Sequence, residues 1–434
     1  MDSFLEKTKR LIPASIFRAL QRPYHFVLAW LAAVRYGFPS REIKVIAVTG
    51  TKGKSSTTEI LNAILEEAGL TTGLSNTIRF KVGDDSRRNL FKMSMPGRFA
   101  MQKLLREAVD VGCKYFVLEI TSQGALLFRH RFIELDTLIF TNISPEHIEA
   151  HGSYENYLDS KLAIARNMKR SRKPMKTIIA NADDREAPKF LECAADKKIA
   201  YGLAGAGAYK IKDAGLEFTL DGKTVSSPLS GLFNLYNILA AVTAARNENV
   251  SAAKIASAIS KFGEIPGRVE KVNAGQDFEV VVDYAHTPDS LEKLYKVFRP
   301  DPQAPRSNGA VGNTNGRRLI AVLGGTGGGR DNWKRKEMGR LADLYCDEII
   351  LTDEDPYDES PLKIVADVAT GVSSKKPSII MDRREAIQAA LKLARTGDAV
   401  LITGKGTDPY IMGPRGTKTP WSDAQVAREE LGKI

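Results

Sequence analysis

Short apolar runs alternate with amphipathic stretches along most of the chain. The first run, VIAVT at residues 45–49, is followed by the loop GTKGKSS and by Ile60, Leu61, Ile64 and Leu65, which have helical spacing. This pattern predicts a buried strand, a tight turn and an amphipathic helix. Similar β-rich runs are KYFVLEI (114–120), DTLIFTN (136–142) and KTIIAN (176–181). Strands that alternate with helices are typical of a mostly parallel sheet.

A second series of strand-like runs begins after PGR at residues 266–268. Its members are FEVVVDYA (278–285), LIAVLGG (319–325), EIILTD (348–353), SIIMD (378–382) and DAVLITG (398–404). Residues 300–318, rich in Pro, Gly and Asn, predict a mobile surface loop. Because 434 residues are too many for one core, we predict three parts of α/β class. These are a short helical segment (1–40), a P-loop ATPase domain with a mostly parallel sheet (41–265) and a Rossmann-like C-terminal domain (266–434).

The apolar run FVLAWLAAV, residues 26–34, has two interpretations. Nine residues are too few to cross a bilayer, which needs about 20, and no convincing signal-peptide cleavage site follows the run. The run predicts either a helix packed on the ATPase domain or an interfacial helix with weak membrane association.

The formal net charge of +11 raises the question of nucleic-acid binding. The basic residues are spread along the chain without a five-residue basic block, so the charge favours anionic substrates such as ATP over nucleic acid. Cys113, Cys193 and Cys346 are far apart and form no CxxC pair. This spacing argues against disulfides and a cysteine zinc site, and it favours a cytoplasmic location.

The glycine-rich turn predicts a phosphate-binding site. Its backbone N–H groups and the N-terminus of the following helix can face an anion, Lys54 adds a positive charge, and the Ser55 hydroxyl can bind Mg²⁺. Val48 departs from the general P-loop pattern, which has glycine at that position. The predicted ATP-binding residues of the turn are Gly50, Thr51, Lys52, Gly53, Lys54, Ser55 and Ser56.

Polar residues follow several predicted strands, namely Glu119, Asn142, Asp283 and Asp353. Any one of them could be a helix cap. Their occurrence together with a phosphate loop predicts a ligand site at the carboxyl ends of the strands, where open α/β sheets bind ligands.

Lys161 falls in the middle of an apolar stripe on a helix that starts near Ser153. A lysine that points inward should have a lowered pKa, because burial disfavours the ammonium, and its neutral amine can react with carbon dioxide. The alternative is a lysine that extends to water.

Nine segments together carry a resemblance to a known family. They are TGTKGKSS, LEITSQG (118–124), TNISPEHIEAHGSYENYLDSK (141–161), GLFNLYNILAA (231–241), PGRVE (266–270), VVDYAHTPDSL (281–291), GGTGGGRDNWKR (324–335), TDEDPYDESP (352–361) and TGKGTDPY (403–410). In this order they resemble the Mur ligases over residues 41–434, and most closely the MurE type, the UDP-N-acetylmuramoyl-tripeptide synthetases. The resemblance implies that ATP phosphorylates an acceptor carboxylate and that the amine of an amino acid then attacks the acyl phosphate.

The resemblance also implies roles for single residues. The implied catalytic residues are Lys54, Glu119, His147 and Lys161, with Ser55, Glu119, His147 and a carbamylated Lys161 as Mg²⁺ ligands. Beyond the P-loop, Asn234, Arg268 and Asp283 would bind the nucleotide, and Ser122 and Arg129 the muramoyl-peptide acceptor. The implied amino-acid site contains Arg330, Glu354, Asp355, Tyr357, Gly404 and Asp408.

The sequence departs from the family in three places. About 40 residues precede the P-loop, where relatives have a uridine-binding domain of roughly a hundred, so we expect that domain to be largely missing. Gln123 stands where relatives commonly have histidine. Tyr357 replaces the arginine of the DNPR motif found in relatives that add meso-diaminopimelate.

The added amino acid and the reaction class stay open. The acidic run at 353–359 slightly favours a lysine-like diamino acid over meso-diaminopimelate, although the run can also be a solvated loop. A folylpolyglutamate or poly-γ-glutamate ligase and a non-catalytic ATP-binding partner remain as alternatives. We expect a monomer.

Overall fold

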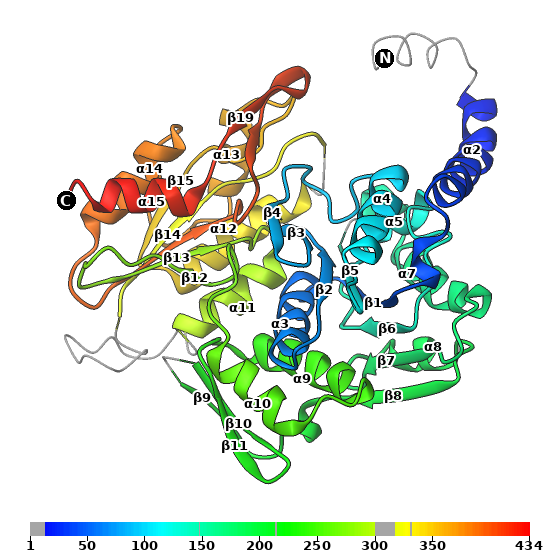
Figure 1. The fold of residues 1–434 in the computed structure, drawn as a ribbon. Coiled ribbons are helices and arrows are strands. Elements are labelled where there is room, and N and C mark those ends of the chain that lie inside the picture. Colours follow the sequence, from blue (N-terminus) through cyan, green and yellow to red (C-terminus); the bar gives the residue numbers. More distant parts are fainter. Residues whose placement is uncertain (1–13, 147, 213–214, 300–316, 330–331) are drawn as a thin grey trace. The chain divides into compact units, whose positions relative to one another are not determined.

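The structure is a computed structural model that describes residues 14–146, 148–212, 215–299, 317–329 and 332–434. Most of the predicted surface loop, His147 and Arg330 therefore lie outside the described residues. The chain forms two compact units that are discontinuous in sequence (Figure 1). The first unit contains residues 1–146, 151–205 and 236–258, and the second contains residues 147–150, 206–235 and 259–434.

The first unit is built on an eight-stranded sheet with the order β4-β3-β2-β5-β1-β6-β7-β8. Strands β2, β5, β1, β6, β7 and β8 run parallel to their neighbours, whereas β3 and β4 add an antiparallel edge. The strands are β1 (Lys44–Thr49), β2 (Thr72–Ser75), β3 (Arg79–Val82), β4 (Asp85–Arg88), β5 (Tyr115–Glu119), β6 (Thr137–Phe140), β7 (Thr177–Asn181) and β8 (Lys197–Tyr201).

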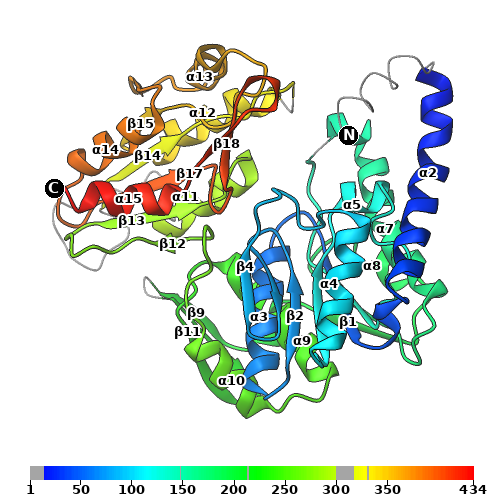
Figure 2. The ribbon, with the colours of Figure 1, turned by 45° about the horizontal axis from the view of Figure 1, so that its top comes forward.

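Helices cover both faces of this sheet, which is why its central strands are continuously apolar. On β1, Val45 and Ala47 belong to a core that also contains residues of α4, α5 and α7, while Ile46 and Val48 point to the opposite face. Figures 1 and 2 show α3 and α4 on opposite sides of β2. The helices are α2 (Ala14–Arg35), α3 (Lys54–Glu67), α4 (Arg98–Asp110), α5 (Ser122–Leu126), α6 (Ile148–His151), α7 (Tyr154–Asn167), α8 (Ala187–Leu191), α9 (Leu232–Asn247) and α10 (Ala252–Lys261).

The second unit contains a six-stranded sheet with the order β12-β13-β17-β14-β15-β16, parallel except for β12. Helices α11, α12 and α13 pack on one face, and α14 and α15 on the other. Its strands are β12 (Glu270–Lys271), β13 (Glu279–Asp283), β14 (Leu319–Leu323), β15 (Glu348–Leu351), β16 (Ser378–Ile379) and β17 (Ala399–Thr403). Its helices are α11 (Pro288–Phe298), α12 (Trp333–Tyr345), α13 (Pro361–Ala369), α14 (Arg383–Leu393) and α15 (Asp423–Leu431).

The predicted α/β class is confirmed, and each predicted strand is present, usually trimmed by one to three residues. Strands β2, β3, β4, β8 and β12 were not predicted, and neither were two small β elements outside the two main sheets. These two elements are a three-stranded antiparallel sheet of β9 (Tyr209–Lys212), β10 (Gly215–Leu220) and β11 (Lys223–Ser227), and a hairpin of β18 (Tyr410–Met412) and β19 (Lys418–Pro420). Within the described ranges, no helix is both long enough and apolar enough to cross a membrane.

Candidate active site

The turn between β1 and α3 is held tightly by its surroundings. Gly53 has φ +81° at the N-terminus of α3, and a Cβ there would lie 2.1 Å from Oδ1 of Asn237. Gly50 has φ +150°, and its Cβ would lie 2.0 Å from Oγ1 of Thr141. Only glycine fits both positions, because each needs an unusual backbone angle and has no room for a methyl group.

The segment after β6 fixes the other side of the turn. The N–H of Thr51 donates to the carbonyl of Asn142 at 2.8 Å, and the N–H of Lys52 donates to Oδ1 of Asn142 at 2.9 Å. The Lys52 ammonium pairs with Glu146 at 3.0 Å, and that of Lys54 donates to the carbonyl of Thr51 at 2.8 Å. The end of one strand thus shapes the phosphate loop that follows another, as expected at the carboxyl edge of a parallel sheet.

Lys161 points into the protein from α7, as its place in the apolar stripe predicted. It is 1% exposed, and its Nζ donates to the carbonyl of Gly50 at 2.6 Å. Burial, followed by the charge of Lys54, lowers the pKa of Lys161 well below the usual lysine value. Tyr157, one turn earlier, places its ring 4.6 Å from Nζ and its hydroxyl 3.0 Å from Oγ1 of Thr51.

Glu119 ends β5 as a buried carboxylate. It accepts hydrogen bonds from the Ser55 hydroxyl at 2.8 Å and from the N–H and hydroxyl of Thr77, each at 3.1 Å. Within the described residues, no lysine or arginine forms an ion pair with it. A buried carboxylate without a cationic partner is costly, and carboxylate and hydroxyl oxygens are the ligands that Mg²⁺ prefers. Glu119 and Ser55 therefore fit the Mg²⁺ role expected of them.

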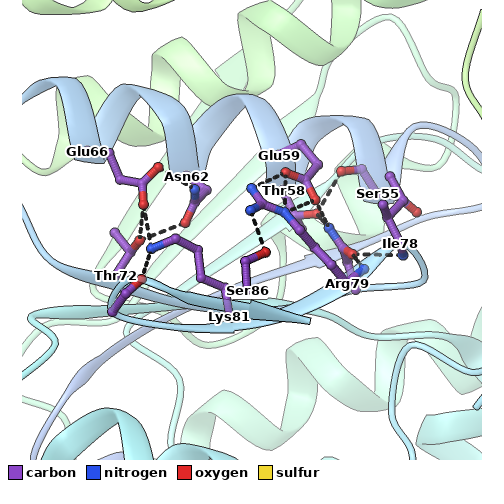
Figure 3. A network of polar contacts seen from close by, with 12 residues as sticks. Ser55, Thr58, Glu59, Asn62, Glu66, Thr72, Ile78, Arg79, Lys81 and Ser86 are labelled. Carbon is purple, nitrogen blue, oxygen red and sulfur yellow. Dashed lines mark hydrogen bonds and ion pairs between the residues drawn. The ribbon is translucent and has the colours of Figure 1, made fainter. Parts of the chain in front are cut away.

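A polar network fixes α3 against the β2–β3 hairpin (Figure 3). Arg79 pairs with Glu59 at 2.6 Å, Lys81 pairs with Glu66 at 2.5 Å, and the Thr72 hydroxyl donates to Asn62 at 2.7 Å. These contacts lie along one side of the helix, so they hold its N-terminus, and with it Ser55, in a defined position.

The expected acceptor residues lie in the same unit. Ser122, at the start of α5, is buried, and its Oγ lies 3.1 Å from Nε2 of His151. Arg129 donates to the carbonyl of Met95 at 2.7 Å. Burial and the charge of Lys161 lower the pKa of His151. His147 lies outside the described residues, and among those described no group of three or more His, Cys, Asp or Glu side chains could hold a metal ion.

The remaining expected nucleotide residues lie in the second unit. Asp283, at the end of β13, accepts the N–H groups of Val269 and Ala285, each at 2.7 Å. The guanidinium of Arg268 lies 4.4 Å from the ring centre of Tyr284. Asn234 is buried and donates to the carbonyl of Ser230 at 2.8 Å. Asp283 thus shapes the turn that carries Arg268.

Most of the acidic run after β15 is occupied by internal partners. Asp355 pairs with Lys405 at 2.8 Å, and Lys405, which is fully buried, also lies 3.4 Å from Asp408. Asp358 accepts the N–H of Arg415 at 2.6 Å, and Glu359 pairs with buried Arg335 at 2.7 Å. These four carboxylates are therefore tied into the structure of the unit.

Glu354 differs from its neighbours. It is 2% exposed, Oε1 accepts the Thr326 hydroxyl at 3.1 Å, and Oε2 is buried with no hydrogen-bond partner among the residues that the structure describes. Burial raises its pKa. Gly404, at the end of β17, leaves room for this carboxylate, since a Cβ there would lie 2.3 Å from Oε2. Tyr357 has a left-handed backbone (φ +52°), and Arg330 lies outside the described residues.

Sequence reasoning missed several residues that shape these sites. Asn237 contacts the phosphate loop from α9, Thr77 completes the Glu119 site, and His151 contacts Ser122. Asn237 and His151 lie within segments that carry the family resemblance, and this position in the sequence is the signal that could have identified them as site residues.

Comparisons with known proteins show which family the sequence matches. Residues 48–245 match the Mur ligase middle domain, and residues 267–406 match the Mur ligase, glutamate ligase domain. The chain is 36% identical over 422 residues to a UDP-N-acetylmuramoyl-L-alanyl-D-glutamate--2,6-diaminopimelate ligase from Syntrophomonas wolfei, covering 94% of this chain and 82% of that protein. It is 36% identical over 434 residues to a UDP-N-acetylmuramyl-tripeptide synthetase from Roseiflexus, with the same coverage.

Among solved structures, a Mycobacterium tuberculosis folylpolyglutamate synthase has a TM-score of 0.70, covering 94% of this chain and 96% of that one. Its sequence identity is 16%, so this likeness concerns the fold alone.

Proposed function

This chain belongs to the Mur ligase family of ATP-dependent ligases, and from that premise we propose that it adds a diamino acid to a muramoyl-L-alanyl-D-glutamate acceptor. The observation that carries the proposal is the identity of 36% to muramyl-tripeptide ligases over 94% of the chain. The buried pair of Ser55 and Glu119 beside the phosphate loop supports it, because this pair suits a metal-bound nucleotide.

The chain's own residues can support each step of this reaction. Backbone N–H groups of the loop and Lys54 offset the charge of the ATP phosphates while an oxygen of the acceptor carboxylate attacks the γ-phosphorus. The bond between this phosphorus and the β–γ bridging oxygen breaks, which gives an acyl phosphate and ADP. The amine of the amino acid then attacks the acyl carbon, an amide forms, and phosphate leaves. Mg²⁺, held by Ser55 and Glu119, would reduce the repulsion between the two anions.

We also propose that Lys161 acts as a carbamate. Its neutral amine attacks carbon dioxide, forms an N–C bond and loses a proton, which leaves a negative group at the end of the side chain. Three observations support this: the side chain is buried, its Nζ lies against the loop carbonyl of Gly50, and its pKa is lowered. A carbamate would place an anion where a second cation can bind.

Glu354 is the residue that we expect to bind the side chain of the added amino acid. Its unpartnered buried oxygen can accept a hydrogen bond from the distal ammonium of a diamino acid. Tyr357 offers one neutral hydrogen bond where an arginine would offer a bidentate pair to a second carboxylate. The site therefore favours a lysine-like side chain slightly over meso-diaminopimelate. Because ATP is consumed, we propose a cytoplasmic enzyme, and we expect a monomer.

An acceptor and amino-acid panel tests the proposal. Phosphate release from ATP is measured with UDP-N-acetylmuramoyl-L-Ala-D-Glu, the same acceptor without UDP, and folate or poly-γ-glutamate, each with L-lysine, meso-diaminopimelate or L-glutamate. We expect release only when a muramoyl-dipeptide acceptor and a diamino acid are both present. Release only with folate and glutamate would show a folylpolyglutamate-type ligase, and no release with any pair would favour a non-catalytic protein.

A further inference from the structure

Helix α2 has two different apolar faces. Ala29, Ala32 and Ala33 are buried on the side where the helix packs on α4. The opposite side carries an exposed stripe of large apolar side chains at helical spacing. Its members and their exposed fractions are Tyr24 (56%), Val27 (50%), Trp30 (46%), Leu31 (43%) and Val34 (47%). We call these five residues the α2 stripe.

The helix is anchored firmly enough for the α2 stripe to face outward in a defined way. Phe26 lies edge-on to Phe132, with ring centres 5.2 Å apart, and also contacts Phe128 at 6.5 Å. The small alanines let α2 approach α4 closely, so the large residues are left on the far side. Figure 2 shows α2 along the edge of the first unit, and no other described helix or strand is drawn over its outer face.

The charges on helix α2 itself are all positive, and Arg35, one turn after Leu31, lies beside the α2 stripe. Helix α2 contains Arg18, Arg22 and Arg35 and no acidic residue. Arg98 lies near His25, on the side of α2 that carries the buried alanines, where its charge, after burial, helps to lower the pKa of His25. Within the described residues Arg98 forms no ion pair with a carboxylate. A large apolar face on a helix with only basic charges matches the composition of helices that lie in the interface of an anionic bilayer.

We propose that the α2 stripe binds the surface of an anionic lipid bilayer. Leu31, Val27 and Val34 enter the acyl boundary, Tyr24 and Trp30 occupy the headgroup level, and Arg35 faces the lipid phosphates. A second copy of the chain is a poorer occupant, because two identical basic helices would repel each other. The helix lies on the bilayer rather than spanning it. This inference is independent of the reaction.

Vesicle binding by the purified full-length protein tests this proposal. The probe is vesicles of equal parts phosphatidylcholine and phosphatidylglycerol, with phosphatidylcholine vesicles for comparison. We expect binding to the anionic vesicles, and at least tenfold weaker binding for Leu31→Glu, equivalent to about 1.4 kcal/mol. The matched control is Met175→Glu, which adds the same charge at an exposed methionine (57%) elsewhere in the first unit and should bind normally.

Tryptophan fluorescence gives a second, local measurement. On binding, emission should shift to shorter wavelength in the wild type and in Trp333→Phe, which removes an exposed tryptophan of the second unit, and should not shift in Trp30→Phe. Absence of binding to anionic vesicles, or equal binding by Leu31→Glu and Met175→Glu, would overturn the proposal. A dimer in light scattering that Leu31→Glu dissociates would assign the stripe to self-association instead.

Discussion

Lys161 illustrates how much one residue's environment decides its chemistry. The apolar spacing of its helix predicted an inward side chain, and the structure places it at 1% exposure. Spacing could not predict its partner, because the carbonyl of Gly50 lies 111 positions away in the sequence. Residue periodicity reports which face is buried, whereas the contact depends on how the strands bring distant turns together.

Replacing Lys161 tests its proposed carbamate. Lys161→Ala should lose most ligase activity, about a hundredfold or more, because a charged group at the phosphate loop is removed. Added short carboxylates should restore part of the activity by occupying the space. In the wild type, ¹³C-labelled carbon dioxide should give a carbamate signal in the NMR spectrum that Lys161→Ala lacks. Lys189→Ala, at an exposed lysine, is the control; full activity of Lys161→Ala would contradict the proposed role.

The sequence alone does not distinguish Glu354 from the neighbouring carboxylates of the acidic run. The acidic run was predicted to suit an ammonium as a group, yet Lys405 and Arg335, distant in sequence, already pair with Asp355 and Glu359. Only the structure shows that one buried oxygen of Glu354 has no hydrogen-bond partner among the described residues.

Glu354→Gln tests the proposed ammonium contact. The charge is removed with little change in shape, so kcat/KM for L-lysine should fall about 10- to 150-fold, or roughly 1.5–3 kcal/mol. The control is Asp358→Asn, at a carboxylate that accepts a backbone N–H, and this change should affect kcat/KM for L-lysine little. Lysine and meso-diaminopimelate are supplied together at equal concentration, and product masses are measured. A strong diaminopimelate preference that persists in Tyr357→Ala would argue against the role given to Tyr357.

At the scale of elements, the strands with continuous apolar runs could be predicted, whereas β2, β3, β4, β8 and β12 and the supports of the turns could not. Each predicted strand had a continuous apolar run, since helices cover both faces of its sheet. The β9–β11 sheet was missed although Leu216, Phe218 and Leu220 alternate and are buried. Its strands are short, and β9 is fully exposed, so the period-two signal is weak.

The turn between β1 and α3 depends on an element much later in the chain. A Cβ at Gly53 would meet Asn237 of α9, whereas one at Gly69, with a similar φ of +80°, would meet nothing within 4 Å. Gly69→Ala should therefore cost about 1–2 kcal/mol of stability for its backbone angle alone and leave ATP binding unchanged. Gly53→Ala should in addition weaken ATP binding at least tenfold. Calorimetric titration with ATP and urea unfolding measure both effects, and equal ATP affinities would refute the assigned contact.

At the scale of the whole molecule, stability should depend on pH through a buried histidine. His130 is 3% exposed, and both ring nitrogens are buried with no hydrogen-bond partner in the described part of the chain. Burial lowers its pKa from 6.5 to about 3. Between these values the unfolded chain binds a proton that the folded protein does not, so stability is lost as the pH falls from 6.5 toward 3.

Replacing this histidine should flatten the pH dependence. His130→Phe should reduce the slope of the unfolding free energy against pH by about 1.4 kcal/mol per pH unit in that window. Urea unfolding of both proteins at several pH values below 6.5 measures the slopes. Parallel slopes for the wild type and His130→Phe would show that other groups cause the acid sensitivity.

The contact between the phosphate loop and α9 also determines at which point of its synthesis the chain can bind nucleotide. Thr57 and Asn237 form one packed site although 180 positions separate them. A ribosome makes the loop early and its support much later, after most of the first unit has been translated. An unfinished chain would then present the loop without Asn237, and we expect such a chain to bind ATP poorly. Competence to bind nucleotide would thus arrive only when the whole first unit has left the ribosome.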